Sequence, residues 1–299
     1  MKLDYNIFSV LLAAFAPLIG LIVAIILDRE RRKKSEKPPQ TEKLLRPPGH
    51  SLAIQLDKTI DAVMDGILTA CSLSAFAGVC VLALDNLLAG RAPFSWLAIC
   101  VFVFFLFVIA CALAAIKAFR HVKKAQDIRL GLRGEQAVAE SLGEAADSGF
   151  RAFHDLPGGD NWNIDHVAVG PRGVFLIETK ARRRRTSRNG QPEHEVIFDG
   201  DALQFPTFKE TKPIEQAKRN AAWLSNYLTK KTGEPVRVEP LVVLPGWFVR
   251  IVEKGNFPVK AMNANYLVRF LAGQTEIIQP AQVRRIIAAL DEKCRDVEF

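Results

Sequence analysis

The sequence lacks the cysteine pattern of a zinc protein or of a disulfide-bonded one. Its 299 residues include five cysteines, with no CxxC pair and no cluster of His and Cys at zinc-ligand spacing. Four of the five lie inside apolar stretches, where a thiol behaves as a small hydrophobic side chain. The pattern argues against a disulfide framework and fits a reduced, cytosolic C-terminal half.

Charge is missing from three long apolar runs, although 24% of the chain is charged. The runs cover residues 7–27, 67–84 and 96–116, and each reaches the ~18 residues that indicate a membrane span. Because no charged side chain lies within them, a transporter or sensor subunit is disfavoured. The second run is closest to the threshold, so a buried or re-entrant helix is the alternative there.

The first run also resembles a cleaved signal peptide, but it is too long for one, and its basic cluster follows it. We therefore expect an uncleaved anchor. Lys and Arg are dense after the first run and again after the third, so the positive-inside rule places both flanks in the cytoplasm. This predicts a multi-pass protein of the plasma (inner) membrane, with the N-terminus outside and the C-terminal domain in the cytoplasm.

The expected organisation follows from these runs. Residues 1–27 form a transmembrane anchor, 28–66 a basic linker, 67–116 two transmembrane helices and 117–130 a connector. The net charge of +8 favours polyanionic neighbours, either nucleic acid or anionic lipid, and cannot choose between them.

From about residue 131 the pattern becomes that of an α/β domain. Residues 131–143 predict a helix whose apolar stripe includes Leu132, Ala139 and Leu142, and Glu135 lies on the same stripe. A buried carboxylate is costly unless something pairs with it, which would make Glu135 a site residue. The alternative is that Glu135 lies in the first turn and interacts with the helix dipole. The helix pattern does not decide between them.

Two short strands, 164–169 and 174–180, are predicted around the turn sequence Gly170-Pro171-Arg172-Gly173. An even, symmetric turn places Asp165 directly opposite Glu178, with Cβ atoms about 4.5–5.5 Å apart. Lys180 is two residues further along and projects from the same face.

Two facing carboxylates repel each other, and a divalent cation would remove the repulsion. Mg²⁺ is typically held by one or two carboxylates plus phosphate oxygens of a substrate. Lys180 can then orient a water or stabilise charge on the phosphate. The alternative is a solvated surface hairpin, which the four apolar residues 174–177 disfavour because they indicate a strand buried on both faces.

Further elements complete the predicted domain. Residues 213–228 predict a helix opened by Pro213, with Gln216 beside its apolar stripe and able to reach a site. A strand at 236–244 and helices at 265–272 and 280–291 follow. Beyond Lys180 stands a run of four arginines that can track a phosphate backbone, although such runs are usually solvated loops: Arg182, Arg183, Arg184 and Arg185. His166 should point away from Asp165 and is left out of the site.

Several of these phrases together resemble the nuclease-related domain (NERD) family over about residues 131–246. They are Gly134-Glu135, Asn163-Ile164-Asp165-His166, the string from Gly170 to Lys180, and Pro213-Ile214-Glu215-Gln216. The resemblance implies a restriction-endonuclease-like α/β fold, a mixed sheet flanked by helices. Beyond it, the two predicted closing helices make 247–299 a helical extension.

The same resemblance implies metal-dependent phosphodiester hydrolysis. Asp165 and Glu178 would bind Mg²⁺ (or Mn²⁺) with help from Glu135, Lys180 would position the nucleophilic water, and Gln216 would complete the set. The chain departs from the family where four arginines stand in place of aromatic residues and glycine, which bears on substrate geometry. We expect a membrane-anchored nuclease acting on DNA or RNA at the cytoplasmic face. The alternative is a non-catalytic nucleic-acid-binding or scaffold module with the same fold.

Overall fold

The computed structural model describes Leu27, Arg31 and residues 43–88, 93–159, 162–184, 194–252 and 255–297. At 70, 71, 73–88, 93–100, 103 and 104 it describes the backbone alone. The described chain forms two compact units. Asp57–Ala125 belongs to one, and Glu42–Leu56 joins Gln126–Glu298 in the other. The first expected span, residues 7–27, lies outside the described residues except for Leu27.

Two long helices contain the second and third apolar runs. They are α2 (His50–Leu88) and α3 (Pro93–Glu144). Among the described residues, one stretch, Phe105–Ser148, is long and apolar enough to cross a membrane by length and composition. Large apolar side chains near its start are exposed, among them Phe105, Leu113 and Ile116. Three spans were expected, and among the described residues one helix meets this criterion.

The central sheet of the second unit is mixed, as predicted. Its order is β10-β8-β4-β3-β2, with β2, β3 and β4 antiparallel and β4, β8 and β10 parallel. All seven residues of the central strand β4 are buried, which is why that strand is apolar on both faces. The five strands are β2 (Arg151–Gly159), β3 (Trp162–Gly170), β4 (Gly173–Thr179), β8 (Val238–Val243) and β10 (Lys260–Met262).

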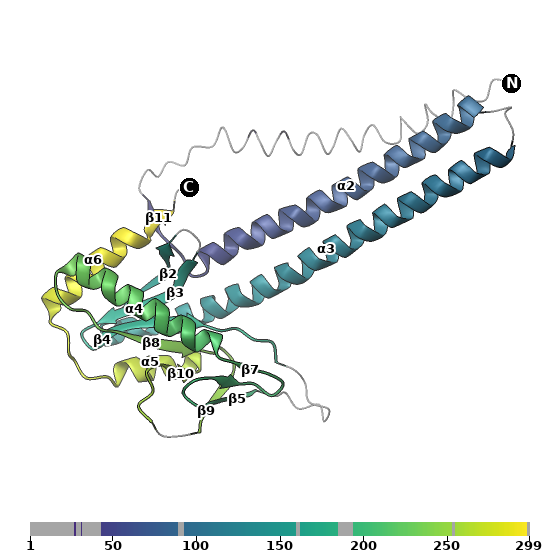
Figure 1. Ribbon diagram of the computed structural model, residues 1–299. Coiled ribbons are helices and arrows are strands. Elements are labelled where there is room, and N and C mark those ends of the chain that lie inside the picture. The colour runs from purple at the N-terminus through teal and green to yellow at the C-terminus, as the bar shows by residue number, and fades with distance from the viewer. Residues whose placement is uncertain are drawn as a thin grey trace. The chain divides into compact units, whose positions relative to one another are not determined.

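Helices cover both faces of this sheet. On one face α4 (Lys212–Thr232) and α6 (Pro280–Cys294) pack on a core that includes Val174 and Leu176 of β4 (Figure 1). On the other face the end of α3 and α5 (Ala264–Ala272) pack on Phe175 and Ile177. Because side chains alternate along a strand, Glu178 and Lys180 project from the α4 face of β4.

Several short strands were not predicted from the sequence. A four-stranded sheet has the order β7-β6-β5-β9, and β1 pairs with β11. Strands of two to four residues carry no measurable periodicity and are fixed by tertiary pairing. Two of them, together with β10 of the central sheet, lie in the expected helical extension 247–299. The short strands are β1 (Leu44–Leu45), β5 (Glu195–Phe198), β6 (Leu203–Gln204), β7 (Lys209–Glu210), β9 (Phe248–Ile251) and β11 (Arg295–Val297).

The helix predicted at 131–143 does not begin there. It is the last part of α3, which runs unbroken from Pro93 to Glu144. Gly131 and Gly134 lower helix propensity but do not end a helix, and no proline or cap separates the two parts. Glu135 is therefore far from the first turn of its helix. The interpretation that it interacts with the helix dipole is wrong, and its burial needs another explanation.

Candidate active site

The β3–β4 hairpin has the predicted register. Gly170 pairs with Gly173, Val169 with Val174 and His166 with Ile177. The next residues across the ladder are Asp165 and Glu178. The backbone N–H of Thr179 donates to Asp165 Oδ2 at 2.7 Å, so this carboxylate lies against β4 beside Glu178.

Lys180 joins two elements at the end of β4. Its Nζ is 2.6 Å from Glu178 Oε1 and 3.3 Å from Oε1 of Gln216 on α4. Its backbone N–H donates to the Val243 carbonyl of β8 at 2.9 Å. Glu178 is 1% exposed, and its second oxygen, Oε2, is buried without a hydrogen-bond partner. Lys180 is therefore held by Glu178, Gln216 and Val243, and Glu178 Oε2 is left without a hydrogen-bond partner.

Glu135 approaches the same place from the opposite face of the sheet. It is 6% exposed, and its Oε2 is also buried without a partner. The approach depends on Gly134, because a Cβ there would lie 2.6 Å from the Cβ of Ala181, just beyond Lys180. A glycine lets α3 pack directly against the end of β4, which brings the neighbouring carboxylate to the site.

This contact gives a prediction with an internal control. Replacing Gly134 by alanine should lower the free energy of unfolding by about 1–3 kcal/mol because of overpacking against Ala181. The same change at Gly143 in the same helix meets no atom within 4 Å and should be neutral or stabilise by up to ~1 kcal/mol. Thermal or denaturant unfolding of both variants checks this; equal effects would contradict the close approach.

Burial raises the pKa of all three acids. Burial raises the pKa of Glu135 to about 8, assisted by the charges of Asp155 and Glu178. Burial, then Glu178 and Glu135, raise the pKa of Asp165 well above its usual range. Burial also raises the pKa of Glu178, although Lys180 opposes the shift. Lys180 lowers the pKa of each acid but does not offset the effect of burial.

A divalent cation fits this cluster. Among the described residues no group of three or more Asp, Glu, His or Cys side chains is placed to hold a metal ion by itself. Mg²⁺ does not require one, because it usually takes one or two carboxylates and completes its shell with water and substrate phosphates. The two unpartnered oxygens of Glu135 and Glu178 and the facing carboxylate of Asp165 are hard donors of the kind such an ion prefers.

A fourth buried acid, Asp155, was not predicted from the sequence. Asp155 is fully buried in β2 with a positive φ of 50°. Its neighbours His154 and Leu156 pair with His166 and Ile164, so the residue across from it is Asp165. The strand was not predicted, because Pro157 and the two glycines after it read as a turn. The available signal was an acid directly before Leu156 and two residues after Phe153.

His166 belongs to a different cluster, as expected. Its Nδ1 lies 2.8 Å from Nδ1 of His154 on β2. Burial lowers the pKa of both rings, that of His154 to about 4. Both are therefore neutral near pH 7, and one ring donates to the other.

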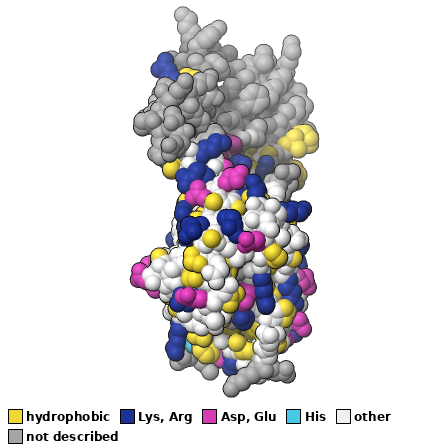
Figure 2. All heavy atoms as spheres, turned by 90° about the vertical axis from the view of Figure 1, so that its left-hand side faces the viewer, with side chains coloured by type: hydrophobic (Ala, Val, Ile, Leu, Met, Phe, Trp, Pro, Cys, Tyr) yellow, Lys and Arg dark blue, Asp and Glu magenta, His cyan; other side chains and the backbone are white. Residues whose placement is uncertain are grey.

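Two of the four arginines after Lys180 form ion pairs within the protein. Arg182 makes a two-pronged ion pair with Glu210, with the shortest contact 2.8 Å. Arg183 lies 2.8 Å from Asp127, with both side chains exposed. Arg184 packs against Gly246, and Arg185 lies outside the described residues. On the face in Figure 2, Lys and Arg are interspersed with Asp and Glu. Contact of this run with nucleic acid stays a prediction.

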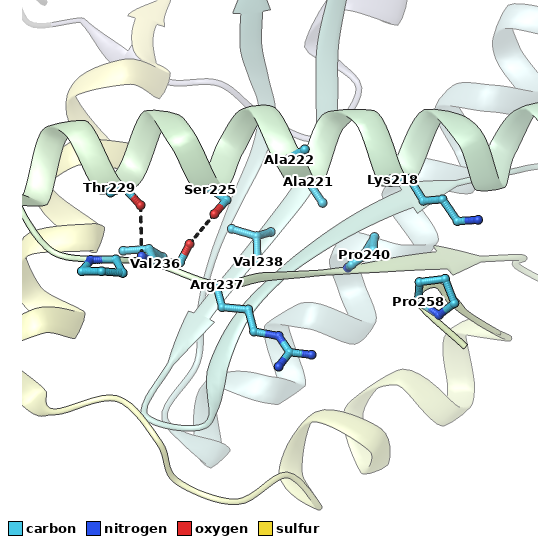
Figure 3. Close-up of a pocket in the computed structure, with 11 residues that line it drawn as sticks. Lys218, Ala221, Ala222, Ser225, Thr229, Val236, Arg237, Val238, Pro240 and Pro258 are labelled. Atoms are coloured by element: carbon cyan, nitrogen blue, oxygen red, sulfur yellow. Dashed lines mark hydrogen bonds between the residues drawn. The ribbon is translucent and has the colours of Figure 1, made fainter. Parts of the chain in front are cut away.

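A cavity of about 510 Å³ beside α4 is separate from the acids (Figure 3). Lys218, Arg237 and Pro240 are among its lining residues, and the lining contains no carboxylate. Two of its hydroxyls are used by the backbone of Val236: Ser225 Oγ donates to the carbonyl, and Thr229 Oγ1 accepts from the N–H.

The mixed sheet thus carries buried carboxylates and one lysine at the end of its central strand. Residues 130–245 match the model of the family described as the nuclease-related domain, NERD. The chain therefore contains a nuclease-related domain, and the matched segment includes Glu135, Asp165, Glu178, Lys180 and Gln216. No curated protein and no solved structure matches the chain.

Proposed function

We propose that the protein is a membrane-anchored, divalent-cation-dependent nuclease that hydrolyses phosphodiester bonds of nucleic acid at the cytoplasmic face. The observation that carries the proposal is the cluster of Asp165, Glu178 and Glu135 beside Lys180, with two buried carboxylate oxygens unpartnered. Its position inside the nuclease-related segment supports the same function.

Each acid has a distinct part in this proposal. Asp165 and Glu178 would hold Mg²⁺ or Mn²⁺ from adjacent strands, and Glu135 would add a donor from α3. The bound cation would neutralise charge on the phosphate and lower the pKa of a water molecule. Burial of the carboxylates keeps water from competing for their oxygens and strengthens their electrostatic effect.

Lys180 acts directly on the reacting groups in this scheme. An ammonium group has three N–H donors, and two of them bond Glu178 and Gln216. The third can hold a water or a phosphate oxygen in line with the scissile bond. Gln216 is then a positioning residue, because it fixes the direction of Lys180 from α4.

The membrane anchor is the second part of the proposal. It is supported by the apolar stretch Phe105–Ser148 and by the basic residues that follow its apolar part, Lys117, Arg120, Lys123 and Lys124. By the positive-inside rule these residues favour a cytoplasmic nuclease-related domain in a multi-pass protein of the plasma (inner) membrane.

Cleavage by the purified full-length protein tests the function. DNA or RNA should be cut with Mg²⁺ or Mn²⁺, and a chelator should stop the reaction. Lys180→Ala should reduce the rate by about 10²–10³-fold, the loss typical for one electrostatic donor in a buried site. Lys209→Ala, which removes an exposed pair with Asp199, is the matched control and should cut normally. Binding without cleavage, with a steep salt dependence, would instead favour the nucleic-acid-binding module.

A further inference from the structure

The segment that precedes Asp57–Ala125 in the chain is part of the unit that contains the candidate site. Glu42–Leu56 belongs with Gln126–Glu298, not with the residues that follow it in the chain. Leu44 and Leu45 pair with β11, and the backbone N–H of Arg46 donates to the Cys294 carbonyl at 3.0 Å. The expected basic linker 28–66 therefore contains a stretch with defined tertiary contacts.

Arg46 connects this segment to the buried acid of β2. Its Nη1 lies 2.9 Å from Asp155 Oδ2, while its Nε and Nη2 bind the carboxylate of Asp296 at 2.7 and 2.6 Å. The guanidinium thus spans two acids far apart in the sequence. Its side chain is 18% exposed and that of Asp155 is 0% exposed, so the inner half of the bridge is shielded from solvent.

Both oxygens of Asp155 are fully used. Ser51 donates twice, from Oγ to Oδ2 at 2.7 Å and from its backbone N–H to Oδ1 at 3.2 Å. Asn163 Nδ2 donates to Oδ1 at 2.6 Å. Asp155 also has a positive φ of 50°, a backbone strain that persists only where surrounding contacts hold it. These contacts fix the start of α2, where Ser51 lies.

The turn at residues 47–50, just before Ser51, also lies beside Glu135. The N–H of His50 bonds the Pro47 carbonyl at 3.2 Å, and Gly49 between them has φ +73°. The backbone N–H of Gly49 hydrogen-bonds the carboxylate of Glu135. A Cβ at Gly49 would lie 2.3 Å from Leu132 Cδ1 and 3.7 Å from Glu135 Oε2. Asp155 and Glu135 are therefore joined through residues 49–51.

We propose that Asp155 is a positioning residue of the cation site: held by Arg46, it fixes the turn at residues 49–51, whose Gly49 N–H orients the carboxylate of Glu135. The inference rests on the proposed function, because it takes Glu135 as a cation donor. Carboxylates that bind metals are themselves hydrogen-bonded, and loss of such a supporting contact typically costs about 10–100-fold in affinity.

The test is the affinity of the full-length protein for Mn²⁺ alone, measured by calorimetry. Asp155→Asn and Ser51→Ala should each weaken binding by about 10–100-fold. Arg46→Lys retains the charge but cannot bind Asp155 and Asp296 together as a guanidinium does. It should therefore weaken Mn²⁺ binding less than Arg46→Ala does. Arg151→Ala is the control: it breaks an Arg–Asp bridge of 2.8 Å to Asp291 elsewhere in the same unit and should bind Mn²⁺ normally.

The outcomes separate this inference from the proposed function. If the wild type and Glu178→Ala bind Mn²⁺ equally, or neither binds, the cation site itself is wrong. If Glu178→Ala abolishes binding while Asp155→Asn and Ser51→Ala bind as tightly as wild type, only the positioning role is overturned. A loss in Arg151→Ala as large as theirs would also overturn it, because general destabilisation would then explain all three. Should Asp155→Asn fail to fold, the unchanged or weakened affinity of Ser51→Ala decides.

Discussion

Glu178→Gln is expected to abolish nucleic acid cleavage without loss of stability. The glutamine has the same shape, retains an oxygen for Lys180 and removes the charge that would hold the cation. Loss of several kcal/mol of charge stabilisation corresponds to a rate reduction of roughly 10³-fold or more. Because burial raises the pKa of Glu178, a neutral side chain at this position should leave the thermal unfolding temperature unchanged or higher.

Two comparisons make this result specific. Glu239→Gln on β8 removes an ion pair of 3.2 Å with Lys260 and should leave cleavage intact. Rates of both variants, measured at saturating Mg²⁺ together with their unfolding temperatures, give the answer. A Glu178→Gln protein that cuts at the wild-type rate would remove the acid cluster from the mechanism.

Mn²⁺ affinity is expected to rise by about 100-fold between pH 6 and pH 8 and then level off. The pKa of Glu135 is raised to about 8, mainly by burial, so below that pH the group is protonated. A cation binds the ionised form, so each binding event releases a proton and the affinity changes about tenfold per pH unit. Titrations in buffers of different ionisation enthalpy measure both the affinity and the proton released.

The stability of the cation-free protein should have the opposite dependence on pH. The pKa of Glu135 in the folded protein lies above its usual value of 4.5, so the folded state binds the extra proton between those values. Unfolding should therefore become easier as pH rises from about 4.5 to 8 and change little above that. Glu135→Gln should flatten this slope and the pH dependence of Mn²⁺ binding. Affinity that is constant from pH 6 to pH 8 in the wild type would contradict the assignment.

The sequence predicted those site residues whose relation is local. The turn between Gly170 and Gly173 fixes the hairpin register, and that register alone places Asp165 across from Glu178. Period-two alternation then sets the direction of Lys180. Gln216 was expected to reach toward the site from its position beside an apolar stripe, and it bonds Lys180. These inferences need no knowledge of the remaining fold.

Contacts between distant segments could not be predicted in the same way. The stripe of the helix showed Glu135 facing inward, but only the continuous helix α3 excludes a first-turn role. Asp155 and its partner Arg46 are 109 residues apart. No sequence pattern around either residue indicates that the two are in contact. Arg46 lies in the basic stretch 28–66, which was assigned to a linker because charge runs are usually solvated.

The domain that contains the candidate site is discontinuous in sequence, because most of helices α2 and α3 is inserted into it. Glu42–Leu56 and Gln126–Glu298 form one folding unit, and Asp57–Ala125 is inserted between its two parts. A fragment that begins near residue 131 would thus be an incomplete domain, with Asp155 buried and missing its arginine. Conversely, a protease cut anywhere between residues 57 and 125 would not free this unit as one intact chain. The N-terminal fragment, which includes Glu42–Leu56, would stay bound to Gln126–Glu298 by non-covalent contacts, as in a fragment-complementation pair.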